Sequence, residues 1–482
     1  MDSNSDTANN TIGSRYRRIV SHPYATLLVV SLTLLSDTLV YGIIIPALPD
    51  ILQKQWHLTK RYNGLLFGAF GLGVLVGAPL SAIISDRRSI RKELIAVGLL
   101  GLALASGVFS IATAFWQLMV ARLFMGLSSG VAWSVGLGLL AHTFPKERMG
   151  PAMGTASSAY TLGFLGGPVV GGYLYNIGGL KIIASFIAVI AGINLVALFI
   201  LKESTSVSFS RENSSTLLEA GDEPSSSDQA RSNEHTPLLL GQKQSSQQQS
   251  PSATDGQNAR PSPTTSMVSV ASSATNKASF RSLVSDPVVL FCLFVTIVES
   301  GCVGSLEPVL PLHLSQKYDL SPGTIGWIFM FLVIPGIVAG PVLGALSDNP
   351  TILRFMGSYG RYGIVGISCL VAGIAFCLVG ISGNIVVTEI FLACTGFAAS
   401  ASMIPIMSSL GARAEVAESS NAYIHIYALW NMSYSLGVFL FPPLASLCFA
   451  ELGFAWTCAM LGAFMFLCGV LVFLTMASRG SL

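Results

Sequence analysis

Charged side chains are scarce in this 482-residue chain, in which Asp, Glu, Lys and Arg together make up 10% of the residues and hydrophobic residues 52%. A soluble domain would carry about a quarter charged residues. The charges are gathered into short segments, and the apolar runs between them reach about 20 residues or more, long enough to cross a bilayer as helices. The composition therefore excludes a soluble globular protein and predicts a polytopic membrane protein.

Cysteine is also sparse, and it follows no pattern. All eight cysteines fall in the second half of the chain, mostly inside apolar runs, and none forms a CxxC pair. We interpret them as small buried hydrophobic residues, which argues against a disulfide framework and a metal site. The sequence also lacks a phosphate-binding loop, a nucleotide-binding cassette and a catalytic triad. We therefore expect neither an enzyme nor a cofactor nor a nucleic-acid partner.

The apolar runs predict an all-α membrane protein with twelve transmembrane helices in two six-helix halves. A central stretch rich in Ser, Gln, Asn, Thr and Pro cannot bury enough apolar surface to fold, so we expect it to be a disordered linker. The predicted segments are an N-terminal tail (1–23), a first half (24–201), the linker (202–285), a second half (286–477) and a short C-terminal tail (478–482).

The first apolar run has a copy 262 residues later, which indicates an internal duplication. At this offset Glu299 lies on Asp37, and Pro308-Val309-Leu310-Pro311 lies on Pro46-Ala47-Leu48-Pro49. The two halves are therefore expected to be pseudo-symmetric.

Basic residues predict the orientation of the chain. Three arginines precede the first run, and most of the 26 basic residues fall in cytosolic segments if the N-terminus is cytosolic. The positive-inside rule then places both termini and the linker in the cytosol. Within 234–240 of the linker, Glu234 stands four residues before Leu238-Leu239, as in an acidic dileucine signal read by a sorting adaptor. Chance is the alternative in so biased a stretch. We expect a vacuolar or plasma-membrane protein, with the peroxisomal membrane as an alternative.

Ionisable residues inside the predicted helices are the candidates for function, since each costs about 2.5–3.5 kcal/mol on insertion scales. Asp37 and Glu299 lie near the middle of their helices, where a carboxylate is a candidate for binding a proton. A structural hydrogen bond is the alternative. Glu307 and Glu389 lie nearer to helix ends, where water could solvate them. Arg122 is expected to pair with a carboxylate or to polarise one during proton transfer.

Three stretches resemble motifs of the major facilitator superfamily, a family of twelve-helix transporters. Gly163, Gly167, Pro168, Gly171 and Gly172 match its antiporter motif, Gly-xxx-Gly-Pro-xx-Gly-Gly. Glycines spaced by four residues let two helices approach closely, and the proline bends the helix.

The other two motifs are less complete. Arg122-Leu123-Phe124-Met125-Gly126 is similar to the superfamily's Arg-xx-Gln-Gly stretch, with Met125 in place of Gln. The segment with Asp86, Arg87 and Arg91 resembles its gating loop, and Asp348 repeats the acidic member in the second half.

Within the superfamily, the chain resembles proton-coupled drug and vesicular amine antiporters, through Leu35–Thr38, Leu306–Pro311 and Ser402–Met407. In the fold of this family the helices of Asp37 and Glu299 line the central cavity, so the resemblance implies that these acids exchange a proton for a cationic substrate. Family position makes Asn431 and Tyr434 candidate substrate contacts. Phe70, Ser400 and Asn431 stand where the amine transporters have a Lys and two Asp residues. Fungal multidrug and secondary-metabolite exporters fit these departures better.

The resemblance implies a monomeric antiporter in the bilayer, driven by the proton gradient, that exports a drug, amine or secondary metabolite from the cytosol to the exterior or an organelle lumen. Two alternatives stay open. One is a uniporter or symporter that moves a metabolite or biosynthetic intermediate between an organelle and the cytosol. The other is a transceptor that kept the fold and does not transport.

Overall fold

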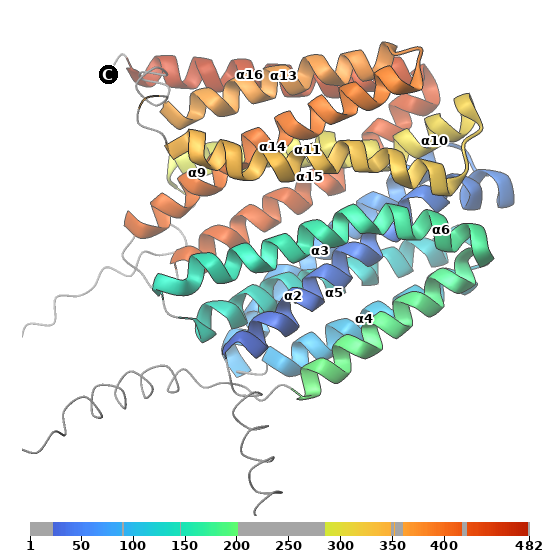
Figure 1. Cartoon of the computed structure of the whole chain (residues 1–482), viewed down its shortest axis with the longest axis horizontal. Helices are drawn as coiled ribbons and strands as arrows, with labels where there is room; N and C mark the ends of the chain where they lie inside the picture. The colour runs from blue at the N-terminus through green and yellow to red at the C-terminus, as the bar shows by residue number, and fades with distance from the viewer. Residues whose placement is uncertain are drawn as a thin grey trace, which may run out of the picture. The chain divides into compact units, whose positions relative to one another are not determined.

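The protein was analysed as a computed structural model, which describes residues 23–88, 91–144, 146–200, 285–348, 351, 360–416 and 422–480. Every regular element in these ranges is a helix, and Figure 1 shows them as long rods with the first half in blue to green and the second in yellow to red. The predicted linker up to residue 284 lies outside the described residues, and so do Glu234, Leu238 and Leu239 of the proposed sorting signal.

The first half begins with α2, which two short helical turns, η1 and η2, continue. Its longest helix, α6, is two membrane helices joined at Gly178 and Gly179, whose backbone angles are not helical. Gly179 has φ 64°, a conformation that glycine adopts at no steric cost. The elements are α2 (Pro23–Ile43), η1 (Ile45–Ala47), η2 (Asp50–Gln55), α3 (Arg61–Arg88), α4 (Arg91–Ile111), α5 (Phe115–Thr143) and α6 (Lys146–Ile200).

The second half opens with a broken helix, α9 and α10, which meet at Ser305. The break follows from the sequence, because Pro308 and Pro311 have no N–H to donate to the preceding turn. The elements are α9 (Pro287–Gly304), α10 (Leu306–Tyr318), α11 (Pro322–Asp348), α13 (Gly360–Ile381), α14 (Ile385–Val416), α15 (Ala422–Leu452) and α16 (Phe454–Gly480).

Within the described ranges, 11 helical segments are long and apolar enough to cross a membrane. One of them, Ala152–Ile200, contains the predicted fifth and sixth spans on either side of the glycine pair. Another, Pro287–Tyr318, joins α9 and α10 into a single span. The predicted all-α membrane fold is therefore confirmed. The described ranges give 11 segments and not the predicted twelve helices, because the fifth and sixth helices are counted as one segment.

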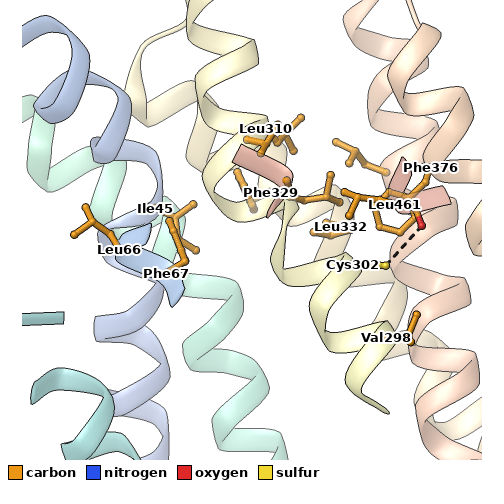
Figure 2. Close-up of a cluster of buried hydrophobic side chains, with 14 of the residues drawn as sticks. Ile45, Leu66, Phe67, Val298, Cys302, Leu310, Phe329, Leu332, Phe376 and Leu461 are labelled. Atoms are coloured by element: carbon orange, nitrogen blue, oxygen red, sulfur yellow. Dashed lines mark hydrogen bonds between the residues drawn. The ribbon is translucent and has the colours of Figure 1, made fainter. Parts of the chain in front are cut away.

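Glycine-mediated contacts hold the helices of each half close together. A methyl group added at Gly167 of α6 would lie 2.8 Å from the Cα of Gly42 in α2. A Cβ atom added at Gly126 of α5 would meet the carbonyl of Phe70. A Cβ atom added at Gly396 of α14 would meet the carbonyl of Leu332. Such approaches are the usual use of small residues between membrane helices. Apolar side chains fill the space around them, including Phe67 and Leu310 in Figure 2.

The two halves touch along α3–α15 and α6–α11. The Cβ position of Gly68 lies 2.8 Å from the ring of Pro443, and that of Gly172 lies 2.8 Å from the Cα of Gly323. Asn63 adds a hydrogen bond of 3.2 Å from its amide nitrogen to the Pro308 carbonyl. We call this end of the bundle the sealed end. It is formed by residues 44–71, 168–176, 306–326 and 439–454.

Candidate functional site

A cavity lies between α2, α3, α5 and α6 of the first half and α15 of the second. It holds about 670 Å³ of empty space, open surroundings included. Aromatic and small side chains make up most of its wall, and Asp37 is its one charged residue. The lining residues are Asp37, Thr38, Tyr41, Phe70, Gly71, Val74, Ser129, Trp133, Tyr160, Phe164, Trp430, Asn431, Tyr434, Ser435 and Val438.

Asp37 is held by two donors from one face of α5. The Ser129 hydroxyl donates to its Oδ2 at 2.7 Å, and the Trp133 indole nitrogen donates to the same oxygen at 3.2 Å. The two donors are four residues apart and therefore share a helix face. Hydrogen bonds to a charged group contribute about 1.5–3 kcal/mol each, enough to offset the cost of placing the acid in a membrane helix. Among the described residues, Oδ1 receives no hydrogen bond, so it is free to bind a proton or a substrate group.

Aromatic rings from both halves surround the space beside Asp37. The rings of Trp133 and Tyr160 pack edge to face at 4.9 Å, and Trp430 lies 5.8 Å from Tyr434. Tyr160 and Tyr434 also interact through their hydroxyl groups across the cavity. A single carboxylate among aromatic faces suits a small molecule with an apolar body and a cationic or hydrogen-bond-donating group.

Glu307 connects the second half to the cavity wall. Its Oε2 accepts a hydrogen bond from the hydroxyl of Tyr41, which lies one turn beyond Asp37 in α2. Glu307 is only 5% exposed, which differs from the watery helix end expected from the sequence. The physical reason is that α10 continues past Glu307 to Tyr318, so that Glu307 lies inside the bundle.

Arg122 lies behind the cavity in an aromatic cage. Its side chain is fully buried, and its guanidinium carbon lies 5.2–5.9 Å from the ring centres of Tyr41, Phe67, Phe70 and Phe109. None of its guanidinium nitrogens has a hydrogen-bond partner among the described residues, so the expected pairing with a carboxylate is not formed there. A desolvated cation–π contact contributes about 2 kcal/mol, which helps to hold the charge.

Glu299 is buried and does not line this cavity. The neighbouring Ser300 faces α15, where its hydroxyl donates to the Tyr434 carbonyl at 3.0 Å. One residue turns a helix by about 100°, so Glu299 points away from α15, toward Ser402 of α14 and Cys468 of α16. Its Oε2 has no hydrogen-bond partner in the described part of the chain. The expected symmetric pair of cavity acids is therefore not formed.

The antiporter motif is a packing surface beside the cavity. Gly163, Gly167 and Gly171 lie against α2, and Gly172 lies against Pro322 and Gly323 of α11. The carbonyl of Pro168 meets the Cβ position of Gly326, so one motif contacts both halves.

The remaining candidates lie in three places. Asn431 and Tyr434, the candidate substrate contacts from family position, line the cavity. Arg91 is the first residue of α4. Asp86 and Arg87 lie in the last turn of α3, and Asp348 ends α11. The side chains of Asp86, Arg87 and Asp348 are outside the described part. Glu389 lies in a groove of its own, away from the cavity.

Sequence reasoning missed several cavity residues, namely Tyr41, Ser129, Trp133, Tyr160 and Phe164. A signal was available for three of them. Ser129 and Trp133 have the four-residue spacing that places two donors on one face of an apolar helix. Tyr41 likewise follows Asp37 by four residues, on the same face of α2.

Comparison with known proteins identifies the family. A family model described as "Major Facilitator Superfamily" matches residues 30–427. The chain belongs to the major facilitator superfamily. Among curated relatives, the MFS-type transporter ppzB of Metarhizium majus is 25% identical over 336 residues, 66% of this chain and 68% of that protein. The mouse MFS-type transporter SLC18B1 is 30% identical over 198 residues, 40% of this chain and 43% of that protein.

Solved structures of the superfamily share the fold. A bacterial homolog of the human lysosomal transporter Spinster, in an inward-facing and occupied conformation, aligns with a TM-score of 0.65 over 96% of this chain and 97% of that chain, at 13% identity. The human organic anion transporter MFSD10 aligns with a TM-score of 0.59 over 93% of this chain and 99% of that chain, at 18% identity. At these identities the likeness concerns the fold alone. The chain is thus an integral, multi-pass transporter of small organic molecules.

Proposed function

We propose that this superfamily member is a proton-coupled antiporter that exports a small organic molecule from the cytosol to the exterior or an organelle lumen. The observation that carries the proposal is the position of Asp37, a buried carboxylate on the wall of a cavity shared by both halves. A charge in a membrane helix that faces a cavity marks a substrate or proton pathway. The antiporter motif packed beside it supports exchange rather than symport.

The exchange step follows from the two oxygens of Asp37. Ser129 and Trp133 hold Oδ2, so the carboxylate keeps one orientation while Oδ1 remains available. A proton and a cationic substrate group compete for this oxygen, because each neutralises the same charge. Binding of one therefore releases the other, which is the requirement for antiport.

Glu307, rather than Glu299, is the second acid of this proposal. It contacts the cavity residue Tyr41 across the two halves, whereas Glu299 points into its own half. Opening of the sealed end separates α10 from α2 and breaks the bond between Tyr41 and Glu307. Arg122 lies beside the Tyr41 ring and is electrostatically coupled to Glu307. It can therefore stabilise the Glu307 carboxylate once the hydrogen bond from Tyr41 is broken.

The direction of transport follows if the N-terminus is cytosolic. The first residues of α2 then lie at the cytosolic side, and the sealed end faces the exterior or lumen. The conformation is one that receives substrate from the cytosol. Because its walls are aromatic and carry one carboxylate, the preferred substrate is an amphiphilic monocation with an aromatic or apolar body. The Staphylococcus aureus quinolone resistance protein NorA, 30% identical over 136 residues, supports a drug-like substrate.

The decisive experiment is uptake of a fluorescent aromatic monocation into proteoliposomes with an imposed pH gradient. Asp37→Asn should lower gradient-driven uptake by about 100-fold, which corresponds to about 2.7 kcal/mol. Asp319→Asn is the matched control, since Asp319 is exposed and has φ 50°, a conformation that Asn tolerates. Full uptake by Asp37→Asn would contradict the proposal. Uptake that persists after the gradient is collapsed would identify a uniporter.

A further inference from the structure

Each half carries a small hydrogen-bonded unit next to its membrane acid. In the first half, Thr38 follows Asp37, and its hydroxyl donates to the backbone carbonyl of Tyr160 in α6 at 3.0 Å. Three residues after Tyr160, a Cβ atom added at Gly163 would lie 2.2 Å from the same hydroxyl oxygen. Only glycine lets α6 approach this closely, so the backbone of Tyr160 is held against the helix that bears the acid.

The second half repeats the unit in full. Ser300 follows Glu299, and its hydroxyl donates to the backbone carbonyl of Tyr434 in α15 at 3.0 Å. Three residues after Tyr434, a Cβ atom added at Gly437 would lie 2.2 Å from that hydroxyl oxygen. The same Tyr-x-x-Gly spacing and the same partner beside the acid make the two tyrosines equivalent residues of the duplicated fold.

The two equivalent tyrosines also contact each other. The hydroxyl groups of Tyr160 and Tyr434 form a hydrogen bond. When two equivalent halves face each other, a residue can meet its own counterpart only at the axis that relates the halves. We call this pair the tyrosine bar, and it lies on the pseudo-two-fold axis of the molecule.

The tyrosine bar joins opposite walls of the central cavity. Tyr160 belongs to α6, which packs mainly against α2 and α11, whereas Tyr434 belongs to α15, which packs mainly against α3 and α9. Both side chains line the cavity. Neighbouring rings hold them in place, because Trp133 packs on Tyr160 at 4.9 Å and Trp430 lies 5.8 Å from Tyr434. The bar therefore limits the space that is available beside Asp37.

This limit depends on the width of the bound molecule. A narrow molecule can bind Asp37 on one side of the bar while the hydroxyl bond stays intact. A wider molecule has to break the bond and move the two rings apart. The apolar body of such a molecule offers the freed hydroxyls no new partner, so the free energy of their bond is subtracted from the free energy of binding.

We propose that the tyrosine bar determines the width of the substrate, admitting cations with one narrow ring and disfavouring wider ones by the free energy of its hydroxyl bond. The inference rests on the proposed function, in which a monocation occupies the cavity beside Asp37. Tyr160 and Tyr434 are then specificity-determining residues, and neither hydroxyl is needed for binding of a narrow cation.

The test compares the equilibrium binding of two tritiated monocations, the one-ring phenyltrimethylammonium and the four-ring tetraphenylphosphonium. It uses the full-length protein in phospholipid nanodiscs without a proton gradient, and empty nanodiscs correct for partition into lipid. Tyr160→Phe and Tyr434→Phe should each bind tetraphenylphosphonium about fivefold more tightly and leave the affinity for phenyltrimethylammonium unchanged. The double variant should match the single ones, because either change removes the same bond.

Tyr175→Phe is the matched control. It removes a tyrosine hydroxyl from the same helix as Tyr160, but this hydroxyl accepts a hydrogen bond from Gln55 at 3.0 Å in an exposed position outside the cavity. Both affinities should stay as in the wild type. Size-exclusion chromatography checks that each variant is monodisperse, and should one of the two bar variants fail, the other tests the same bond.

Three results would overturn the proposal. The first is an unchanged affinity for tetraphenylphosphonium in both single variants, and the second is an equal change for the two probes. The third is an additive effect in the double variant, since two hydroxyls that act separately form no bar. Asp37→Asn tests the proposed function separately and should weaken the binding of both probes. If it leaves both unchanged, the role of Asp37 is refuted, and the comparison of the two widths still decides the role of the bar.

Discussion

The two halves of the molecule share their helix packing but not their charged side chains. Gly126 of α5 and Gly396 of α14 each meet a carbonyl of the neighbouring helix in their own half. Gly64 of α3 and Gly326 of α11, which are 262 residues apart, each meet a carbonyl of the opposite half, at Pro442 and Pro168. Both types of contact occur twice, once in each half, so the duplicated backbone is preserved at its closest approaches.

The charged positions have no such symmetry. When α5 and α14 are aligned on Gly126 and Gly396, Arg122 of α5 matches Leu392 of α14. Both side chains are fully buried. Asp37 matches Glu299, but the first faces the cavity and the second points into its own half. The comparison teaches that the glycines define the fold, whereas each half adapted its buried charges separately. The predictions below test this difference between packing and charge.

The largest expected effect concerns Arg122. Leu392, the equivalent residue of α14, shows that a leucine can be fully buried at this point of the fold. Arg122→Leu should therefore leave a folded, monodisperse protein. Transport should fall by about 100-fold, because the charge that acts on Tyr41 and Glu307 is lost. Thermal unfolding measures the first effect, and proteoliposome uptake measures the second.

Arg122→Lys is the matched control, since it keeps the positive charge and loses the planar group that stacks on rings. It should retain more transport than Arg122→Leu. Wild-type transport in Arg122→Leu would show that the caged guanidinium is only structural.

The next effect should be equal in both halves. Gly126→Ala and Gly396→Ala each force a methyl group against a backbone carbonyl, and overpacking of this kind costs about 1–3 kcal/mol. Both variants should show a similar loss of thermal stability. Gly107→Ala, in α4, is the control, because an added Cβ there meets nothing within 4 Å. A large loss in one half alone would contradict the symmetry of the packing.

The sequence predicted what depends on composition and on local spacing. The apolar runs predicted the membrane fold, and the glycine spacing of α6 predicted a close helix contact, which α2 makes with Gly167 and Gly171. It also predicted that Asp37 would be a buried acid. These features depend on the residues of one helix, so their pattern can be read along the chain.

What the sequence could not predict depends on helix rotation and on helix ends. Glu299 and Ser300 are adjacent and therefore point about 100° apart around the helix axis. In a helix that is apolar on all sides, the hydropathy pattern does not show which of the two faces α15. The burial of Glu307 depends on the continuation of α10 to Tyr318 and on the contact with Tyr41 of the other half. That contact joins residues 266 positions apart and has no local signal.

The two acids of the second half should differ in their effect. Glu307→Gln should reduce transport about tenfold, equivalent to about 1.4 kcal/mol, because it replaces the carboxylate that receives the Tyr41 hydrogen bond. Glu299→Gln should reduce it less, because that side chain does not reach the cavity. Uptake at several substrate concentrations would separate an effect on KM from one on turnover. A larger loss in Glu299→Gln would restore the symmetric pair of acids and refute the assignment of Glu307.

The smallest effect is expected at the rim of the sealed end. Arg61 and Glu451 form an ion pair between the halves, but their side chains are 54% and 52% exposed, so solvent screens the attraction. Exposed pairs contribute about 0.2–1 kcal/mol. Arg61→Ala should therefore change thermal stability by less than 1 kcal/mol, and it should shift the population toward the state in which the sealed end is open. Distance measurements between spin labels on α3 and α15 would detect the shift, and Glu451→Ala should reproduce it, because either change removes the same pair. The double variant should add nothing further. An additive effect would mean that each residue acts through other contacts, such as that of the adjacent Lys60 with the Phe449 ring at 4.3 Å.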